Sequence, residues 1–134
     1  MSLEVLIVDD SATTRMVIER IVRLTEPEVG VCHQAMNGRQ AIEILKERWI
    51  DCVFTDLYMP EMDGRELLRR MRENELWRHI PVAVITSAHD NETAVELVQL
   101  GAHCYRTKPL TPEMVRDIFE ALKEKMPWPP ANPL

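Results

Sequence analysis

Glycine, cysteine and aromatic residues are scarce in this chain of 134 residues. Its four glycines form no phosphate-cradling loop, which excludes nucleotide binding of the P-loop or dinucleotide type. The three cysteines, Cys32, Cys52 and Cys104, are odd in number and stand in strand-like segments, so we expect buried thiols and no disulfide framework. Aromatic residues make up 5% of the chain, which gives little support to a platform for stacking bases.

An excess of positive charge and long apolar runs are also missing. The formal net charge is −6, which argues against direct nucleic-acid binding, because that affinity rests on neutralising phosphates with Lys and Arg. No apolar run approaches the roughly 20 residues that span a bilayer, and the first residues do not form a signal sequence. We therefore expect a cytoplasmic protein with no membrane association, and the length allows one folded domain.

Five strand-like segments alternate with five helix-like segments along the chain. Short apolar runs, typical of buried strands, occur at Val5–Val8, Cys52–Thr55 and Val82–Ile85, and two more polar segments, Val29–Met36 and Ala102–Thr107, are also interpreted as strands. Apolar residues at helical spacing follow each run, and they predict helices from Ser11 to about Thr25, from Gly38 to about Trp49, after Gly64, from Asn91 to Leu100, and from Thr111 onward. The helix from Ser11 is expected to make apolar contacts through Met16, Ile21 and Leu24. The second strand is the most polar, which favours an edge position.

This alternation predicts a parallel sheet with helices on both faces, because each parallel connection needs a right-handed crossover. We expect a doubly wound α/β fold of flavodoxin-like strand order 2-1-3-4-5 with five helices. The folded domain should span residues 1–126. Four of the nine prolines lie in residues 127–134, which cannot continue the last helix and form an extended tail or the start of a linker.

Polar side chains stand where four of the strands end. Asp9 and Asp10 follow the first strand, Asp56 the third, Thr86 ends the fourth and Lys108 follows the fifth. Parallel strands share one carboxyl edge, where open α/β sheets bind ligands, so these side chains should converge. Two carboxylates about 4 Å apart repel by roughly 4 kcal/mol at an effective dielectric near 20, so three of them favour a divalent cation such as Mg²⁺.

Each of these residues also has a purely structural interpretation. Asp9-Asp10 is a common turn and helix-cap pair ahead of Ser11, and Asp56 alone could be a strand-end turn residue. Lys108 alone could be a solvated lysine. It precedes Pro109, however, which makes this peptide bond a candidate cis bond. An aspartate, a cation, a lysine and the Thr86 hydroxyl together are the components for forming an aspartyl phosphate by in-line transfer.

The chain resembles a response-regulator receiver domain of two-component signalling, the CheY-like family. The likeness covers about Leu3 to Lys125, and four motifs match in the expected order: Val5-Leu6-Ile7-Val8-Asp9-Asp10-Ser11, Asp56-Leu57-Tyr58-Met59-Pro60-Glu61-Met62-Asp63-Gly64, Ile85-Thr86-Ser87-Ala88 and Lys108-Pro109. The resemblance implies that Asp56 accepts a phosphoryl group from a histidine kinase or histidine phosphotransfer protein. It also implies self-directed phosphotransfer and autodephosphorylation, and no other enzyme activity.

The same resemblance assigns roles around Asp56. Mg²⁺, or Mn²⁺, would be bound by Asp10, Asp56 and the Tyr58 carbonyl, with Asp9 acting through water. The phosphoryl oxygens would be held by Thr86, Lys108 and the backbone amides of Leu57 and Ser87. Tyr105 stands at the family's aromatic switch position and would turn as Thr86 moves toward the phosphoryl group.

The switch would change the face formed by the fourth helix, fifth strand and last helix, and so recruit a protein target or a fused output domain. The family also allows a homodimer linked to phosphorylation. Two alternatives remain open. One is a degenerate receiver that acts only as a docking module. The other is an aspartyl-phosphate phosphatase, which usually needs a second aspartate two residues after the nucleophile, where this chain has Tyr58.

Overall fold

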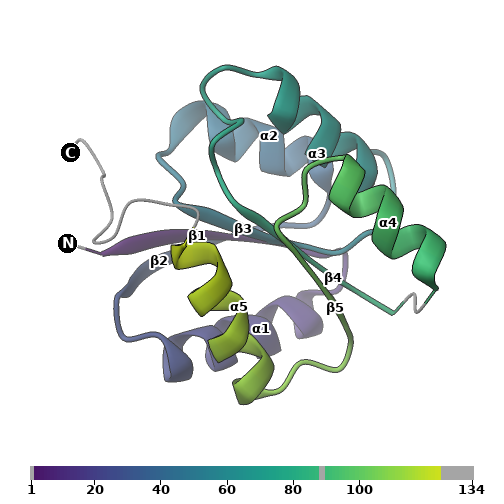
Figure 1. Ribbon diagram of the computed structural model, residues 1–134. Coiled ribbons are helices and arrows are strands. Elements are labelled where there is room, and N and C mark those ends of the chain that lie inside the picture. Colours follow the sequence, from purple (N-terminus) through teal and green to yellow (C-terminus); the bar gives the residue numbers. More distant parts are fainter. Residues whose placement is uncertain (1, 88–89, 125–134) are drawn as a thin grey trace.

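A five-stranded parallel sheet with helices on both faces forms the centre of the molecule (Figure 1). The computed structural model describes residues 2–87 and 90–124. The strands are β1 (Leu3–Val8), β2 (Val29–Ala35), β3 (Cys52–Thr55), β4 (Val82–Thr86) and β5 (Cys104–Thr107), in the order β2-β1-β3-β4-β5. The helices are α1 (Ala12–Thr25), α2 (Gly38–Glu47), α3 (Gly64–Glu73), α4 (Asn91–Gln99) and α5 (Pro112–Lys123). The predicted fold class and strand order are therefore confirmed.

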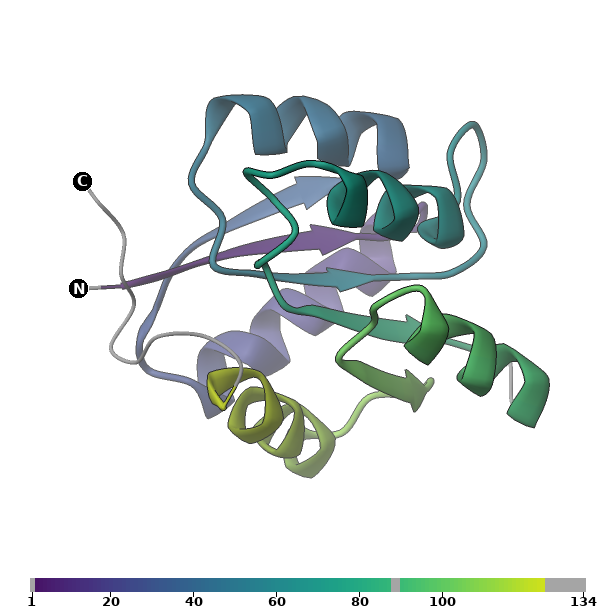
Figure 2. The same cartoon turned by 45° about the horizontal axis from the view of Figure 1, so that its top comes forward.

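The helices divide the core into two layers. Helices α1 and α5 cover one face of the sheet, while α2, α3 and α4 cover the other (Figure 2). Successive strand residues point to opposite faces, so Leu6 and Val53 join the core under α2 and α3, whereas Ile7 and Phe54 join the core under α1 and α5. Burial on both faces explains why β1, β3 and β4 are apolar apart from Glu4 and the threonines that end β3 and β4.

The polar second strand lies at an edge of the sheet, as its sequence predicts. Strand β2 pairs with β1 alone and is only partly buried along most of its length. An edge strand exposes more of its side chains to water, which accounts for the tolerance of polar residues there.

Capping side chains set where the helices begin. Ser11 accepts a hydrogen bond from the amide of Thr14, and Thr111 accepts one from the amide of Met114, with Pro112 in the first turn of α5. Helix α4 ends before Gly101, which has φ of +99°, a conformation that suits glycine.

Two details of the helices differ from the sequence-based expectation. Helix α2 ends at Glu47, before Trp49. On α1 the buried residues are Ile18 and Val22, whereas Met16 and Leu24, expected among its core contacts, are 60% and 76% exposed. The helix carries apolar residues on more than one face, so spacing alone does not identify the face that packs on the sheet.

The proline-rich segment 127–134 and the domain boundary predicted after residue 126 lie outside the described residues, so both remain predictions. Among residues 2–87 and 90–124, no helix is long and apolar enough to span a membrane.

Candidate functional site

The carboxyl ends of β1 and β3 bring two aspartates side by side. These strands are neighbours, and Val8 pairs with Thr55 at their ends. The next residues are Asp9 and Asp56, and the Asp56 amide donates to the Val8 carbonyl at 2.8 Å. The ladder thus continues to the first residue of the site and fixes Asp56 beside Asp9.

Three carboxylates form a cluster at this edge. Asp9, Asp10 and Asp56 each offer one oxygen, and these oxygens lie within 4.8 Å of one another. Asp9 is 1% exposed and Asp56 is 9% exposed, while Asp10 faces solvent. The cluster is therefore open to an ion or a small group on the side of Asp10.

Lys108 reaches this cluster from the end of β5. Its Nζ donates to Asp9 Oδ2 at 2.9 Å and to Asp56 Oδ2 at 3.2 Å. The Lys108 amide donates to the Thr86 carbonyl at 2.8 Å, and the Lys108–Pro109 peptide bond is cis. One ammonium group thus bridges the two buried carboxylates that follow β1 and β3.

The pKa shifts of Asp56 and Lys108 have different causes. Burial raises the pKa of Asp56, and the Asp9 charge adds to this, while Lys108 and the Leu57 amide act in the opposite direction without cancelling it. Burial alone would lower the pKa of Lys108, but its hydrogen bonds and charge interactions with Asp9 and Asp56 raise it overall. The lysine therefore stays protonated. For Asp56, the surrounding positive charge does not fully offset the effect of burial on the carboxyl pKa.

Backbone and side-chain donors orient the two buried aspartates. The Leu57 amide donates to Asp56 Oδ1 at 2.7 Å, and the Ser11 amide donates to Asp9 Oδ1 at 2.9 Å. Arg15 donates to the Asp9 carbonyl at 2.6 Å. The turn interpretation of Asp9 is thus correct in part, because the same carboxylate closes a turn before α1 and binds Lys108.

The donor set fits a hard divalent cation. All three side chains of the cluster offer carboxylate oxygens, the donors that Mg²⁺ prefers, and one ammonium does not neutralise three carboxylates. The pKa of Asp56, raised by burial and by the Asp9 charge, agrees with this, because a nearby cation would favour the charged carboxylate.

The remaining predicted residues lie in or directly after β4 and β5. Thr86 is fully buried at the end of β4, and Ser87 follows it at the surface. Tyr105 is half-buried in β5 opposite Val84, against the core under α2, α3 and α4. Burial, together with the charges of Asp90 and Tyr58, raises the pKa of Tyr105.

A bridge between three elements was not predicted from the sequence. Tyr58 is 54% exposed, and the Arg65 guanidinium carbon of α3 lies 5.4 Å from the centre of its ring. Arg65 Nε also donates to Glu96 Oε1 of α4 at 2.7 Å. These contacts depend on rotamers and on the angle between α3 and α4, which helical periodicity does not specify.

The start of α3 lies tightly against the site. A Cβ on Gly64 would lie 2.3 Å from the Asp56 carbonyl oxygen and 3.0 Å from the Leu57 Cα. The Gly64 amide donates to the Leu57 carbonyl at 2.8 Å. Glycine at this position allows the first turn of α3 to contact the backbone that carries Asp56.

Comparison with known proteins connects this geometry to a family. The family described as "Response regulator receiver domain" matches residues 5–120. Chemotaxis protein CheY-3 of Vibrio cholerae is 32% identical over 127 residues, covering 93% of this chain and 95% of the relative. Chemotaxis protein CheY of Pseudomonas aeruginosa is 31% identical over 126 residues, covering 92% and 98%.

Solved structures show the same similarity. The signal receiver domain of a signal transduction histidine kinase from Syntrophus aciditrophicus superposes with a TM-score of 0.83 at 28% identity, covering 99% of this chain and 98% of that one. A response regulator from Chloroflexus aurantiacus superposes with a TM-score of 0.82 at 26% identity, covering 91% and 98%.

Proposed function

The chain belongs to the response regulator receiver domain family, and from this premise we propose that Asp56 is its phosphoacceptor. Receiver domains are the signalling phosphoacceptors of two-component systems and not conventional enzymes. The observation that supports the assignment to Asp56 is the convergence of Asp9, Asp10, Asp56 and Lys108, in which Asp56 contacts Lys108, as Asp9 also does, and has a raised pKa.

The proposed reaction is an in-line transfer. A carboxylate oxygen of Asp56 attacks the phosphorus of a phosphohistidine on the partner, the P–N bond breaks as the new O–P bond forms, and the imidazole nitrogen recovers its electron pair and takes a proton from water. Such a step depends mostly on positioning and charge stabilisation. Asp56 is held in position by the Leu57 amide and by the β1–β3 ladder.

The neighbouring residues stabilise the transferred group. Lys108, already 3.2 Å from Asp56 Oδ2, would pair with a phosphoryl oxygen, and Thr86 with the amides of Leu57 and Ser87 would donate hydrogen bonds to the others. Asp10, Asp56 and the Tyr58 carbonyl would hold Mg²⁺ or Mn²⁺ directly, with Asp9 acting through water. The ion supplies positive charge that offsets the crowding of carboxylates and phosphoryl oxygens.

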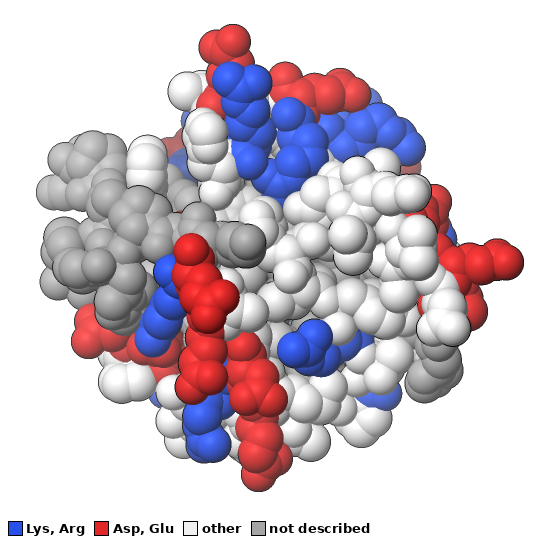
Figure 3. Space-filling view, in the orientation of Figure 1, with Lys and Arg blue, Asp and Glu red and all other residues white. Residues whose placement is uncertain are grey.

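A histidine kinase or phosphotransfer protein is the proposed phosphodonor, and the face of α4, β5 and α5 is the proposed output surface. Val95 and Val98 of α4 are 57% and 66% exposed. In Figure 3 the area over α4 and β5 is largely uncharged, and it is flanked by acidic side chains over α5. Thr86 and Tyr105 connect the site to this face, since they end β4 and lie in β5 respectively.

A phosphorylation experiment tests the assignment. The protein is incubated with Mg²⁺ and acetyl phosphate, and its intact mass is measured for the wild type, Asp56→Asn and the exposed control Asp117→Asn. We expect the wild type and the control to gain one phosphoryl group that hydroxylamine removes, and Asp56→Asn to gain none.

Two other outcomes would contradict the proposal. Phosphorylation of Asp56→Asn would assign the acceptor to another residue. A wild type that gains no mass, from acetyl phosphate or from a phosphorylated phosphotransfer protein, would favour a docking module that works without phosphate. The phosphatase alternative has no support at position 58, where the ring of Tyr58 lies beneath Arg65.

A further inference from the structure

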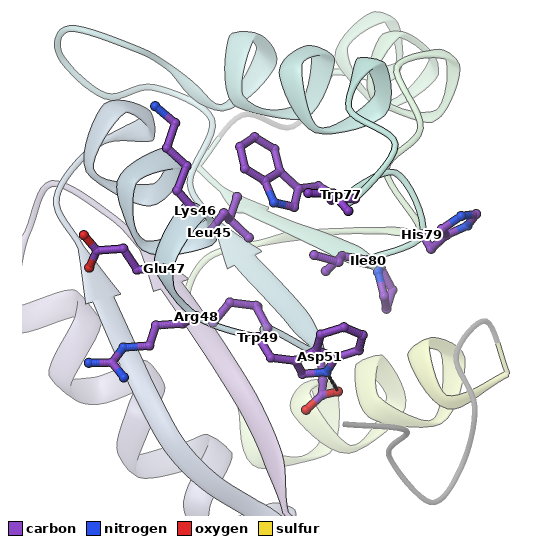
Figure 4. Close-up of a pocket in the computed structure, with 12 residues that line it drawn as sticks. Leu45, Lys46, Glu47, Arg48, Trp49, Asp51, Trp77, His79 and Ile80 are labelled. Carbon is purple, nitrogen blue, oxygen red and sulfur yellow. Dashed lines mark hydrogen bonds between the residues drawn. The ribbon is translucent and has the colours of Figure 1, made fainter. Parts of the chain in front are cut away.

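A second concave site lies at the opposite edge of the sheet from the acidic cluster. A pocket of about 470 Å³ opens where α2 leads into β3 and α3 leads into β4, and its apolar lining includes Leu45, Trp49, Leu76, Trp77, Ile80 and Pro81 (Figure 4). Asp51 at this pocket precedes β3, whereas Asp56 follows it. The volume falls within the range of about 300–1,000 Å³ that is typical of ligand pockets.

Two tryptophans shape this pocket. Trp77 is half-buried and packs on the core next to Leu45, while Trp49 lies beside Asp51. The Trp49 Nε1 donates to Asp51 Oδ1 at 3.0 Å, and the other Asp51 oxygen accepts the Glu4 amide at 2.7 Å. The hydrogen bond to Asp51 holds the Trp49 indole near the start of β3 and satisfies its only polar atom. Trp49 as a whole residue is 45% exposed.

We propose that residues 126–134 of this same chain dock in this tryptophan-lined pocket. The segment reads Met-Pro-Trp-Pro-Pro-Ala-Asn-Pro-Leu and carries no charged side chain. Proline-rich segments of this kind dock in aromatic-lined grooves, because their extended polyproline conformation is already restricted and little entropy is lost on binding. Leu76, 82% exposed at the rim, offers a further apolar contact.

The topology places the end of α5, from which this segment continues, at the correct edge. Helix α5 runs back from the carboxyl edge, where β5 ends, so it ends at the edge from which β1 and β3 begin (Figure 2). Lys123 of α5 pairs with Glu26 at 2.6 Å, and the pocket residue Asp51 donates its amide to the Glu4 carbonyl at 2.8 Å. Layers of secondary structure pack about 10 Å apart, and an extended chain covers about 3.3 Å per residue, so about three residues after Glu124 span one such spacing and the residues from Trp128 onward remain for the pocket.

Tethering makes a weak contact sufficient. A short flexible connection gives a local concentration in the millimolar range, so about half of the molecules would be docked even if the separate peptide binds only with a millimolar dissociation constant. The docking requires no other part of the molecule to change, and it is independent of the phosphoacceptor function proposed above.

Nuclear magnetic resonance of the full chain tests this proposal. The indole signals of Trp49, Trp77 and Trp128 are assigned with single Trp→Phe variants, and the wild type is compared with a full-length variant carrying Trp128→Ser, Pro129→Ser and Pro130→Ser. We expect the Trp49 and Trp77 signals to shift between the two proteins, and the wild type to show nuclear Overhauser contacts from tail proline protons to the Trp77 ring.

A matched pair of exposed leucines locates the contact. Leu76→Ser at the pocket rim is expected to lower the ratio of docked to free tail about tenfold, which corresponds to about 1.4 kcal/mol, and so move the Trp128 signal toward that of a free peptide of residues 124–134. Leu24→Ser on α1, where the leucine is 76% exposed, should leave it unchanged. Both side chains are exposed, so neither variant is expected to impair folding.

Three results would overturn the inference. Trp49 and Trp77 signals that are identical with and without the native tail, and an absence of contacts to tail prolines, would show that the pocket does not hold the segment. Equal effects of Leu76→Ser and Leu24→Ser would place the tail elsewhere. Shifts that grow with protein concentration would make a second copy the occupant instead of the chain's own tail.

Discussion

The side chain of Asp56 lies in an environment that disfavours its charged form and so lowers the stability of the fold. It is 9% exposed, it is near Asp9, and the single ammonium of Lys108 is shared between both carboxylates. Its pKa is raised mainly by burial. The folded state therefore binds a proton at Asp56 more readily than the unfolded state does, and stability is lost as pH rises through the folded-state pKa.

Replacing this carboxyl tests that conclusion. In a metal-chelating buffer at pH 7, Asp56→Asn should increase the free energy of unfolding by an amount on the order of 1 kcal/mol, because it removes a buried charge. The gain should disappear below the unfolded-state pKa of about 3.9, where Asp56 is protonated in both states. Urea unfolding at pH 7 and near pH 3.5 measures it, with Asp117→Asn as the control. A loss of stability at pH 7 would mean that the Lys108 pair outweighs the burial of the charge.

For individual residues, the sequence predicts the edge of the sheet at which a side chain lies better than it predicts the contacts of that side chain. The placement of Asp9, Asp10, Asp56 and Lys108 at one edge follows from their position at the ends of parallel strands. The bridge through Arg65 could not be predicted in the same way, because it depends on the crossing of α3 and α4 and on the rotamers of long side chains.

Among the elements, the contact of α3 with the end of β3 is the tightest near the site. Gly64→Ala should lower the free energy of unfolding by about 1–3 kcal/mol, because its Cβ would meet the backbone of Asp56 and Leu57, which cannot move aside without disturbing the site. Phosphorylation by acetyl phosphate should slow as well.

Gly30→Ala is the matched control for Gly64→Ala. A Cβ at Gly30 would meet the Oγ and Cβ of Ser2, which precedes β1, so a small shift of Ser2 would relieve the contact without moving the backbone of Asp56. Urea unfolding of both variants gives the comparison. Equal losses of stability would show that the close approach at Gly64 is not special.

The packing of α1 against α5 includes a buried charge that needs its partner. Glu26 is 6% exposed and accepts a hydrogen bond from Lys123 Nζ at 2.6 Å. Lys123→Met should lower the free energy of unfolding by about 1–3 kcal/mol, because it leaves a carboxylate uncompensated in a poorly hydrated place.

A second lysine provides the comparison for Lys123→Met. Lys46 forms an exposed pair with Glu43, with exposed fractions of 57% and 66%, so Lys46→Met should cost less than about 0.5 kcal/mol. Chemical unfolding at neutral pH measures both. If the two variants are equally destabilised, the burial of Glu26 does not matter.

The elements themselves were largely predictable, because their signals are local. Apolar runs identified β1, β3 and β4, and Ser11 and Thr111 cap the helices that they were expected to cap. The inward face of α1 was predicted only in part, since Ile21 packs against the core, whereas Met16 and Leu24 are exposed. Tertiary packing determines which face of α1 lies against the sheet, and the spacing of apolar residues along the helix does not specify it.

For the whole molecule, a bound cation should stabilise the fold through the acidic cluster. At a concentration of Mg²⁺ ten to one hundred times its dissociation constant, the wild type should gain about 1.4–2.7 kcal/mol in the free energy of unfolding. Asp10→Asn should reduce this gain substantially, although Asp10 is exposed and its replacement alone should change the stability of the metal-free protein little.

Thermal unfolding with and without Mg²⁺, at matched ionic strength set by sodium chloride, measures this linkage. Asp117→Asn is again the control and should retain the full gain. An equal gain in Asp10→Asn and the wild type would locate the metal away from the cluster.

The side chain of Arg65 has a further implication for how the molecule responds to its surroundings. It contacts the ring of Tyr58 next to Asp56 and also pairs with Glu96 on α4, in a position that is only partly shielded from water. Charge interactions at such positions are screened over about 8 Å at physiological salt. The coupling between the loop after β3 and α4 should therefore weaken as ionic strength rises. A phosphoryl group on Asp56 would then have a smaller effect on α4 in a cell with a higher salt concentration.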